Sequence, residues 1–350
     1  MSALLNEALT DGILDSINNP PKRSLIRQKF TCITRDLYKL TMWRCLASEA
    51  TSVRHKHSVI LCHGLASNRF TFDLDPNVSV ADYLSEQGWD IWLVDLRGSG
   101  MSKNTGGVPR QGYNRCFDDH LEDCRAILQK VRSVSGNQVH FIGHSMGAML
   151  LQCLAVEHSG VNGSLRSGVS IAGSLFMHES NWRGYLWMWS WVKNWTVIRT
   201  GLIQRFLAPF SFRIDSWWDD FFFCVDNVDP NVARKLFMKN WEPLSIELLR
   251  QLRSAFEPSG LTSRDGSKVY ARGMSSIKIP LLLLSGEVDQ QCPPVSVEQL
   301  SSLISTSTYE CVGRTAGQKE QYGHFDLILG LNARKDVWNR VMRYLEANDS

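Results

Sequence analysis

A serine lies between two glycines in the segment GHSMG, residues 143–147, at a point where the local pattern changes. The apolar run VHFIGH ends at residue 144, and the helix-forming run MGAMLLQCLA begins at residue 146. A serine at a sharp turn from strand to helix can present its hydroxyl as a nucleophile, and the glycines Gly143 and Gly147 allow close backbone approach. The helix N-terminus supplies N–H groups that favour developing negative charge. We therefore expect Ser145 to be a nucleophile.

Two residues near the C-terminus could activate this serine. A serine hydroxyl is a poor nucleophile near neutral pH, so it needs a general base, and the base needs an orienting group. His324 lies in YGHFDLILG after the last expected strand, and Asp289 follows the apolar run of LLLLSGEVD. The chain order Ser145, Asp289, His324 differs from the orders found in the two large families of serine proteases. These three residues are the predicted catalytic triad.

Other carboxylates compete with Asp289 for the orienting role. The nearest rivals are Glu287 and Asp326, and two further candidates apply if the acid follows another strand: Asp119 and Asp226. His144 is next to the nucleophile, but its side chain should point to the strand side and pack there.

An oxyanion hole requires two backbone N–H groups near the nucleophile. The first is expected from Met146, the residue after Ser145, and the second from the loop after an earlier strand. In ILCHGLASN, His63 and Gly64 close that strand, and Leu65 is placed to donate its amide. His63 is interpreted as a structural histidine of this loop and not as a general base.

The elements that must position these groups alternate along the chain. A hairpin (27–33, 36–45) is followed by six runs with little polar alternation, which indicates strands buried on both faces of a parallel sheet. Helix-like segments separate them, and this order predicts an α/β fold with a mostly parallel eight-stranded sheet and helices on both faces. The six runs are 57–64, 90–98, 139–144, 167–173, 279–286 and 307–313, and the helices are 79–87, 117–134, 146–158, 295–304 and 334–347.

The alternation stops between residues 175 and 275, where eight of the twelve tryptophans occur. We interpret 175–275 as a helical cap inserted after strand 6 of a core formed by 25–174 and 276–350. Residues 1–24 form an N-terminal extension whose leucines and isoleucines repeat every four residues, which predicts a short helix stopped by Pro20 and Pro21.

Composition excludes several classes of function. The net charge of +3 with no basic stripe argues against a nucleic-acid partner. The nine cysteines form no CxxC pair, and neither HExxH nor a similar spacing occurs, so no cofactor or metal is expected. Scattered cysteines and the lack of a signal peptide or an 18-residue apolar stretch predict a cytoplasmic protein. The alternative is a peripheral membrane protein that uses the cap or the N-terminal helix.

Five motifs together resemble those of the α/β-hydrolase superfamily: HG (63–64), DLRGSGMS (95–102), GHSMG (143–147), GEVD (286–289) and GHFD (323–326). The resemblance implies a Ser145 nucleophile, a His324 base, an Asp289 orienter and oxyanion amides at Leu65 and Met146. The aromatic cap and YGHFDLILG are similar to acid lipases and polyhydroxyalkanoate-type enzymes. The synthases among the latter use a cysteine nucleophile, whereas this chain has Ser145.

The predicted function is hydrolysis of carboxylic esters through an acyl-enzyme, and the expected small-molecule substrate is a hydrophobic or lipid-like ester with an apolar acyl chain. The aromatic cap favours such a chain, although packing between cap and core also explains much of the cap's aromatic content. One alternative is an acyltransferase or thioesterase with the same triad. Another is a non-catalytic ligand-binding receptor, against which the intact triad argues. Dehalogenase or epoxide-hydrolase chemistry would require an aspartate at position 145.

Overall fold

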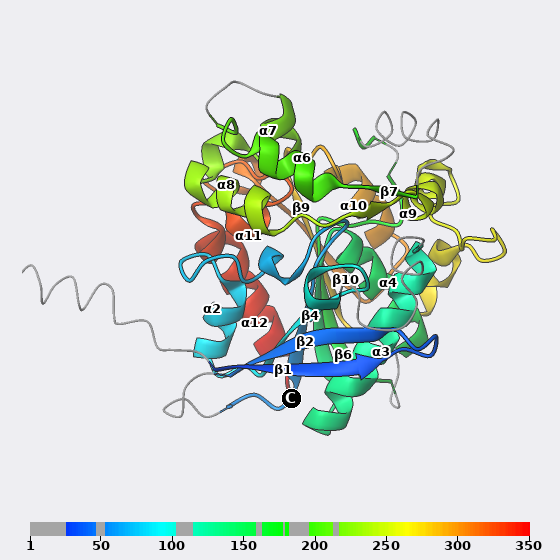
Figure 1. Cartoon of the computed structure of the whole chain (residues 1–350). Helices are drawn as coiled ribbons and strands as arrows, with labels where there is room; N and C mark the ends of the chain where they lie inside the picture. The colour runs from blue at the N-terminus through cyan, green and yellow to red at the C-terminus, as the bar shows by residue number, and fades with distance from the viewer. Residues whose placement is uncertain are drawn as a thin grey trace, which may run out of the picture.

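A computed structural model describes residues 26–46, 53–102, 115–158, 163–177, 179–181, 196–212 and 217–350 of the chain. Within these residues, a central eight-stranded sheet is covered by helices on both faces, and further helices lie across one end of the sheet (Figure 1). The strand order is β1-β2-β4-β3-β5-β6-β9-β10. The strands are β1 (Ile26–Ile33), β2 (Lys39–Leu46), β3 (Ser58–Cys62), β4 (Ile91–Asp95), β5 (Val139–His144), β6 (Leu165–Ile171), β9 (Leu281–Gly286) and β10 (Ser307–Val312).

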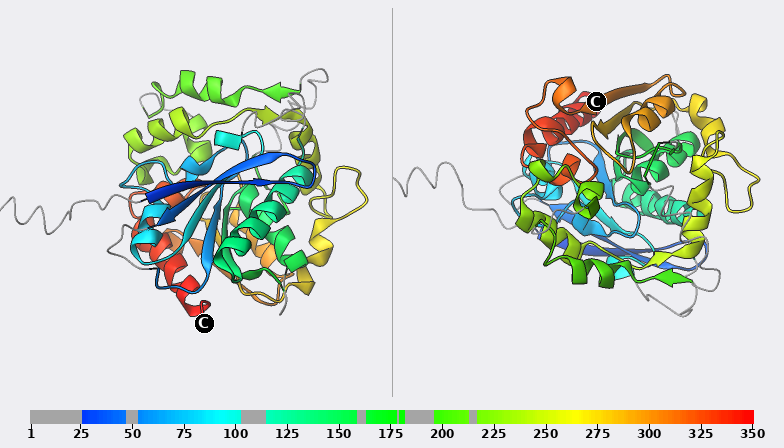
Figure 2. Two further views of the ribbon diagram at one scale, coloured as in Figure 1. Left: turned by 60° about the horizontal axis from the view of Figure 1, so that its bottom comes forward. Right: turned by 90° about the horizontal axis from the view of Figure 1, so that it is seen from above.

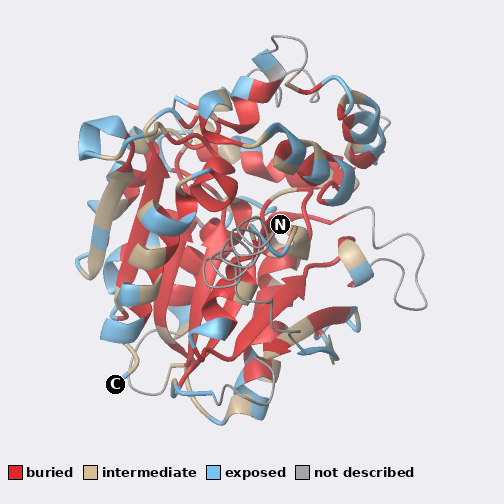
Figure 3. Ribbon diagram, turned by 90° about the vertical axis from the view of Figure 1, so that its left-hand side faces the viewer, coloured by how far each residue is buried: buried red, intermediate tan, exposed pale blue. Residues whose placement is uncertain are grey.

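The six strands from β4 to β10 in this order are parallel, and the β1–β2 hairpin joins them in antiparallel fashion at β4. Every residue of β3, β4, β5 and β9 is buried, which explains why these runs lack polar alternation. Figure 3 shows this buried centre, with exposed residues on the surrounding helices and loops. The predicted eight-stranded, mostly parallel sheet is therefore confirmed.

Helices cover the two faces of the sheet. On one face lie α2 and α12, and on the other lie α3, α4 and α10 (Figures 1 and 2). All residues of α4 from Met146 to Ala155 are buried, because this helix packs on β5 and β6 and is flanked by α3 and by the 3-10 helix η5 (Tyr270–Ser276). The helices are α2 (Val80–Glu86), α3 (Phe117–Ser135), α4 (Met146–His158), α10 (Pro294–Ser301), α11 (Asp326–Leu329), a π-helix (Arg334–Trp338) and α12 (Asn339–Ala347).

Between β6 and β9 the described residues add no strand to the central sheet. They form helices and a separate two-stranded sheet, β7–β8, which the sequence did not predict. Figure 2 shows α6 and α8 lying above the end of the sheet. The elements are β7 (Val197–Ile198), α6 (Thr200–Leu207), α7 (Trp217–Phe222), α8 (Pro230–Lys239), β8 (Leu244–Ser245) and α9 (Ile246–Leu252). The division into a core and a cap at 175–275 remains a prediction.

Short 3-10 helices connect these elements: η1 (Arg69–Thr71), η2 (Gly100–Ser102), η3 (Val225–Asn227), η4 (Arg253–Phe256), η5 (Tyr270–Ser276) and η6 (Arg314–Ala316). All nine cysteines are free thiols in the structure. Among the described helices, none combines the length and the apolar character needed to cross a bilayer. The predicted N-terminal helix and five cap tryptophans (182, 187, 189, 191 and 195) lie outside the described residues.

The sheet topology determines where a ligand can bind. The chain passes from β3 to β4 on one side and returns to β5 on the other side of β3. Loops that leave neighbouring parallel strands in opposite directions open a crevice at their carboxyl ends. The loop after β3 carries His63, Gly64 and Leu65, and the turn after β5 carries Ser145. Two of the predicted site segments therefore meet at this crevice, the topological switch point of the sheet.

Candidate active site

The turn that carries Ser145 is a strained junction between β5 and α4. Ser145 has φ 57°, in the left-handed region that side chains other than glycine rarely adopt. A Cβ atom on Gly143 would lie 2.2 Å from the carbonyl oxygen of Gly147, and one on Gly147 would lie 2.3 Å from that of Cys62. Both glycines are therefore required sterically, and the turn has the geometry of a nucleophile elbow.

The predicted base and acid are in contact. His324 and Asp289 are both buried, and the Nδ1–H of His324 donates to Asp289 Oδ2 at 2.8 Å. The other oxygen of Asp289 accepts the backbone N–H groups of Gln291 at 2.8 Å and Cys292 at 2.9 Å. Since a carboxylate only accepts, Nδ1 carries the proton and the neutral ring has its lone pair on Nε2. That nitrogen is free to act as a base in the cavity that His324 and Ser145 line together.

Three of the four rival carboxylates have other partners, and the fourth is exposed. Glu287 accepts the backbone N–H of Arg314 at 2.7 Å, and Asp119 accepts that of Cys116 at 2.8 Å at the start of α3. Asp226 is exposed in η3, and Asp326 accepts backbone and amide N–H groups. Among the described residues, Asp289 is the carboxylate recorded on the His324 ring, so the geometry favours it as the orienting acid.

The loop after β3 lies directly against the nucleophile. A Cβ on Gly64 would lie 2.8 Å from the Cβ of Ser145, so glycine is needed at this position. Leu65 lines the same cavity as Ser145, and Met146 is the first residue of α4, whose N–H has no acceptor within the helix. The two predicted oxyanion amides therefore belong to segments that meet at Ser145.

Residues 239–242 form hydrogen bonds that hold the loop after β3, which we call the oxyanion loop. The backbone N–H of Glu242 donates to the carbonyl of Ala66 at 2.8 Å, and the amide of Asn68 donates to Glu242 Oε1 at 2.8 Å and to the carbonyl of Lys239 at 2.9 Å. Sequence reasoning missed Asn68 and Glu242, because their partners are more than 170 residues away and no local motif marks them.

Two buried histidines have structural roles beside the site. His63 donates Nδ1–H to the carbonyl of Gly64 at 2.9 Å and accepts the N–H of Leu96 at 3.2 Å, and burial lowers its pKa to about 4. His144 donates Nε2–H to the carbonyl of His324 at 3.1 Å. Burial and the neighbouring His324 ring lower the pKa of His144 well below its usual value. These contacts suit a structural role for His63, and His144 also supports the loop that carries His324.

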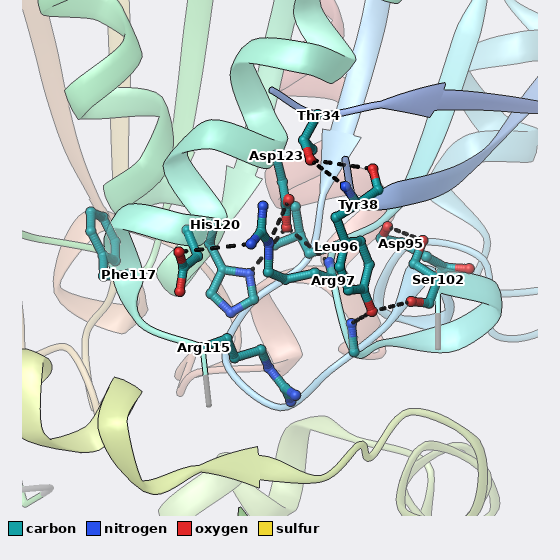
Figure 4. A network of polar contacts seen from close by, with 12 residues as sticks. Thr34, Tyr38, Asp95, Leu96, Arg97, Ser102, Arg115, Phe117, His120 and Asp123 are labelled. Atoms are coloured by element: carbon teal, nitrogen blue, oxygen red, sulfur yellow. Dashed lines mark hydrogen bonds and ion pairs between the residues drawn. The ribbon is translucent and has the colours of Figure 1, made fainter. Parts of the chain in front are cut away.

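The segment DLRGSG forms a polar network beside the oxyanion loop. Figure 4 shows Arg97 between Asp123 and Tyr38. Its Nε donates to Asp123 Oδ1 at 2.8 Å, and its Nη1 donates to Asp36 at 2.7 Å. Asp95 accepts the backbone N–H groups of Arg69 and Met101, each at 3.0 Å. This network joins loops and contains no residue recorded as lining the cavity.

Asp326 joins the loop that carries His324, which we call the histidine loop, to η3 and its flanking residues. Its carboxylate accepts the backbone N–H of Gly323 at 2.8 Å, that of Cys224 at 3.2 Å and the amide of Asn227 at 3.2 Å. Complete burial raises its pKa to about 7, although these donors oppose the rise. Because this pKa is raised by folding, the folded state binds a proton that the unfolded state releases near pH 4. The contribution of Asp326 to stability is therefore lost as the pH rises from about 4 to about 7.

We expect Asp326→Asn to remove this pH dependence. The free energy of unfolding of the wild type, minus that of the variant, should be smaller at pH 8 than at pH 5. Urea unfolding at both pH values measures this difference. Asp265→Asn is the control, because Asp265 is exposed and its pKa is about 2, below this range. An equal effect of Asp326→Asn at both pH values would contradict the expectation.

The cavity above Ser145 is mainly apolar and has about 800 Å³ of empty space, part of it open solvent. Its polar lining includes Ser145, His324 and Gln291, whose side-chain amide donates to the carbonyl of Phe221 at 3.0 Å. The apolar lining comes from the oxyanion loop, the segment between β6 and β9, and the histidine loop: Leu65, Ala66, Ile198, Ile203, Phe221, Phe222, Trp241, Leu244 and Phe325.

Comparisons with known proteins agree with this fold. A family model described as the α/β hydrolase fold matches residues 57–208. Lipase 1 of Drosophila melanogaster is 22% identical over 89% of this chain and 75% of its own length. Poly(3-hydroxyalkanoate) polymerase subunit PhaC of Haloferax mediterranei is also 22% identical, over 87% of this chain and 62% of its own. The solved structure of Paleococcus ferrophilus monoacylglycerol lipase superposes with a TM-score of 0.58 at 14% identity, covering 93% of this chain and 99% of that one.

With this sheet and these relatives, the chain has the α/β-hydrolase fold and is similar to lipases and esterases.

Proposed function

We propose that the protein is a serine hydrolase that cleaves carboxylic esters with an apolar acyl chain. One observation carries this proposal: Ser145 and His324, with Asp289 on the far side of the His324 ring, line one mainly apolar cavity. The apolar walls suit an acyl chain, and the few polar groups at the base of the cavity suit the carbonyl that reacts.

The reaction follows from the positions of the groups. His324 Nε2 takes the proton of the Ser145 hydroxyl as its oxygen attacks the ester carbonyl carbon. The Leu65 and Met146 amides stabilise the oxyanion, and His324 then protonates the leaving alcohol. A water molecule, deprotonated by His324, releases the acid from the acyl-enzyme. Asp289 holds the ring in the required tautomer and stabilises its positive charge.

Acyl transfer to another acceptor is the second candidate function, and the similarity to the PhaC polymerase subunit supports it. The same acyl-enzyme would then react with an alcohol or thiol. Adding glycerol or a short thiol during turnover separates the two functions. An acyl-transfer product that exceeds the free acid would favour the transferase.

Hydrolysis of p-nitrophenyl esters from acetate to palmitate tests the main proposal. We expect kcat/KM to rise with chain length up to the capacity of the cavity, because each buried methylene contributes about 0.8 kcal/mol. A preference for acetate would be consistent with a serine hydrolase but would contradict the proposed preference for an apolar acyl chain. Absence of turnover with every ester would contradict the hydrolase itself.

The proposal includes contact between α6 and a lipid surface. Exposed apolar side chains gather along α6 and just beyond it: Leu202, Ile203, Phe206 and Phe210, of which Phe206 is 74% exposed. Ile203 also lines the cavity, so this apolar face is continuous with the site. Exposed apolar patches of this kind are typical of interaction surfaces.

We expect the double variant Phe206→Ser, Phe210→Ser to bind phosphatidylcholine vesicles at least about tenfold more weakly, since two phenyl groups no longer enter the lipid. Sedimentation with vesicles measures this binding, and hydrolysis of a soluble acetate ester should not change. Ile33→Ser, at an exposed position of β1, is the matched control. Equal vesicle binding by the double variant and the control would contradict lipid contact through α6.

A further inference from the structure

A cluster of histidines lies at the end of the sheet opposite to the catalytic residues. His57 immediately precedes β3, and His140 is the second residue of β5, so both lie at the amino ends of parallel strands. Asp349, from the C-terminal segment, contacts both. Figure 1 shows the C-terminus below the sheet, away from α6, α7 and α8. The cluster is therefore separate from the active site, which lies at the carboxyl ends of the strands.

The donor atoms of these residues are close enough to share one ion. His57 Nδ1 lies 2.8 Å from Asp349 Oδ1, and His140 Nε2 lies 3.4 Å from the same oxygen. One donor atom from each residue lies within 4.8 Å of the other two. Ligands at 2.0–2.2 Å from a tetrahedral zinc ion are about 3.3 Å apart. Small side-chain shifts would therefore bring these atoms into coordination.

Five nitrogens surround the carboxylate of Asp349. Asp349 Oδ1 has three nitrogens around it: the backbone N–H of His57 at 3.0 Å and the two imidazole nitrogens. Its Oδ2 has the backbone N–H of Lys56 at 2.9 Å and His55 Nδ1 at 3.3 Å. Five nitrogens thus face two oxygens that have about four lone-pair sites between them. A cation shared by the carboxylate and the imidazoles would take the place of the imidazole hydrogen bonds, because the imidazoles would then coordinate through lone pairs.

The surroundings hold the candidate ligands in place. His140 Nδ1 lies 2.8 Å from Ser167 Oγ, a contact that can hold the ring and leave Nε2 for a metal. His55 stacks on Trp89 with ring centroids 3.6 Å apart, which fixes the third imidazole beside the carboxylate. His57 and His140 are both buried, so their rings are held within the core.

We propose that His57, His140 and Asp349 bind a zinc ion. Two imidazoles and one carboxylate form a nitrogen-rich set that suits zinc, whereas calcium and magnesium prefer oxygen. The ion would fasten the C-terminal segment to β3 and β5, which are about 290 and 210 residues away in sequence. The ligands come from three separate segments, so no local metal motif marks them in the sequence.

Zinc binding by the full-length protein tests this proposal. The protein is stripped with EDTA, given zinc and desalted, and bound zinc and the unfolding temperature are measured. We expect the wild type to retain one zinc ion per chain that Asp349→Asn and His140→Gln do not retain. Zinc should raise the unfolding temperature of the wild type by a few degrees and that of the two variants by less. His158→Gln, a histidine at the end of α4 outside the cluster, is the matched control and should behave as the wild type.

Cobalt provides a second readout that requires no variant. Cobalt added to the stripped wild type should give the strong visible absorption of a tetrahedral ion, and zinc should abolish it. Equal zinc retention by the wild type and both variants would overturn the proposal. It would also be overturned if the variants lower the unfolding temperature by the same amount with and without zinc, because the cluster would then act through hydrogen bonds only. None of these measurements depends on ester hydrolysis, so they stand apart from the proposed function.

Discussion

Ser145→Ala is expected to lower kcat for ester hydrolysis by about 10⁴- to 10⁶-fold, the range seen when the nucleophile of a serine hydrolase is removed. Without the hydroxyl, no acyl-enzyme forms, and only the oxyanion amides and substrate binding contribute. KM should change little, because the apolar walls of the cavity remain. The elbow should also remain, since alanine keeps the Cβ that the φ of 57° already accommodates.

Kinetics with a p-nitrophenyl ester, together with labelling by a fluorophosphonate, measure this effect. Labelling should be lost in Ser145→Ala and retained in Ser133→Ala, which removes an exposed hydroxyl from α3. If Ser145→Ala keeps more than about a hundredth of the wild-type kcat, another residue is the nucleophile.

Asp289→Asn is expected to lower kcat by about 10⁴-fold while the protein remains folded. The carboxylate accepts two backbone N–H groups with Oδ1 and the His324 ring with Oδ2. An asparagine would keep its carbonyl oxygen toward the backbone donors and turn its NH₂ group toward His324. Nδ1 would then have to accept, which moves the proton to Nε2 and removes the base.

Glu287→Gln is the matched control for this prediction. Glu287 is two residues away in the same loop, and its carboxylate accepts the backbone N–H groups of Arg314 and Thr315 instead. We expect its kcat to stay within about threefold of the wild type, since it does not contact His324. A large loss in Glu287→Gln with little loss in Asp289→Asn would assign the acid to Glu287. The ester assay and the unfolding temperature of each variant distinguish this result from misfolding.

Much of the fold could be predicted from the sequence because its strands are either wholly buried or part of a local hairpin. The runs that became β3, β5 and β9 are apolar without interruption, and this pattern occurs where both faces of a strand are covered. The short strands β7 and β8 were missed, since two residues each carry no periodicity. They pair with each other across 45 residues, a contact that depends on the packing of the segment between them.

The proposed catalytic residues could be recognised from the sequence because each lies just after a strand in a small, local motif. GHSMG, GEVD and GHFD each combine a turn-forming glycine with one reactive side chain, and this local chemistry is visible without a fold. The choice between Asp289 and its rivals was not visible in this way. All are carboxylates near glycines, and only the three-dimensional arrangement places one of them 2.8 Å from the His324 ring.

The sequence by itself therefore determined the class of sheet and the position and order of the proposed reacting groups, because these depend on patterns within about ten residues. The tertiary structure decided which distant groups meet. The support of the oxyanion loop by Asn68 and Glu242, the bond from His144 to the carbonyl of His324, and the convergence of His57 and His140 on Asp349 are of this second kind. Each joins segments far apart in the chain, and such contacts form only where the packing of the whole core brings polar groups together and burial requires them to be paired.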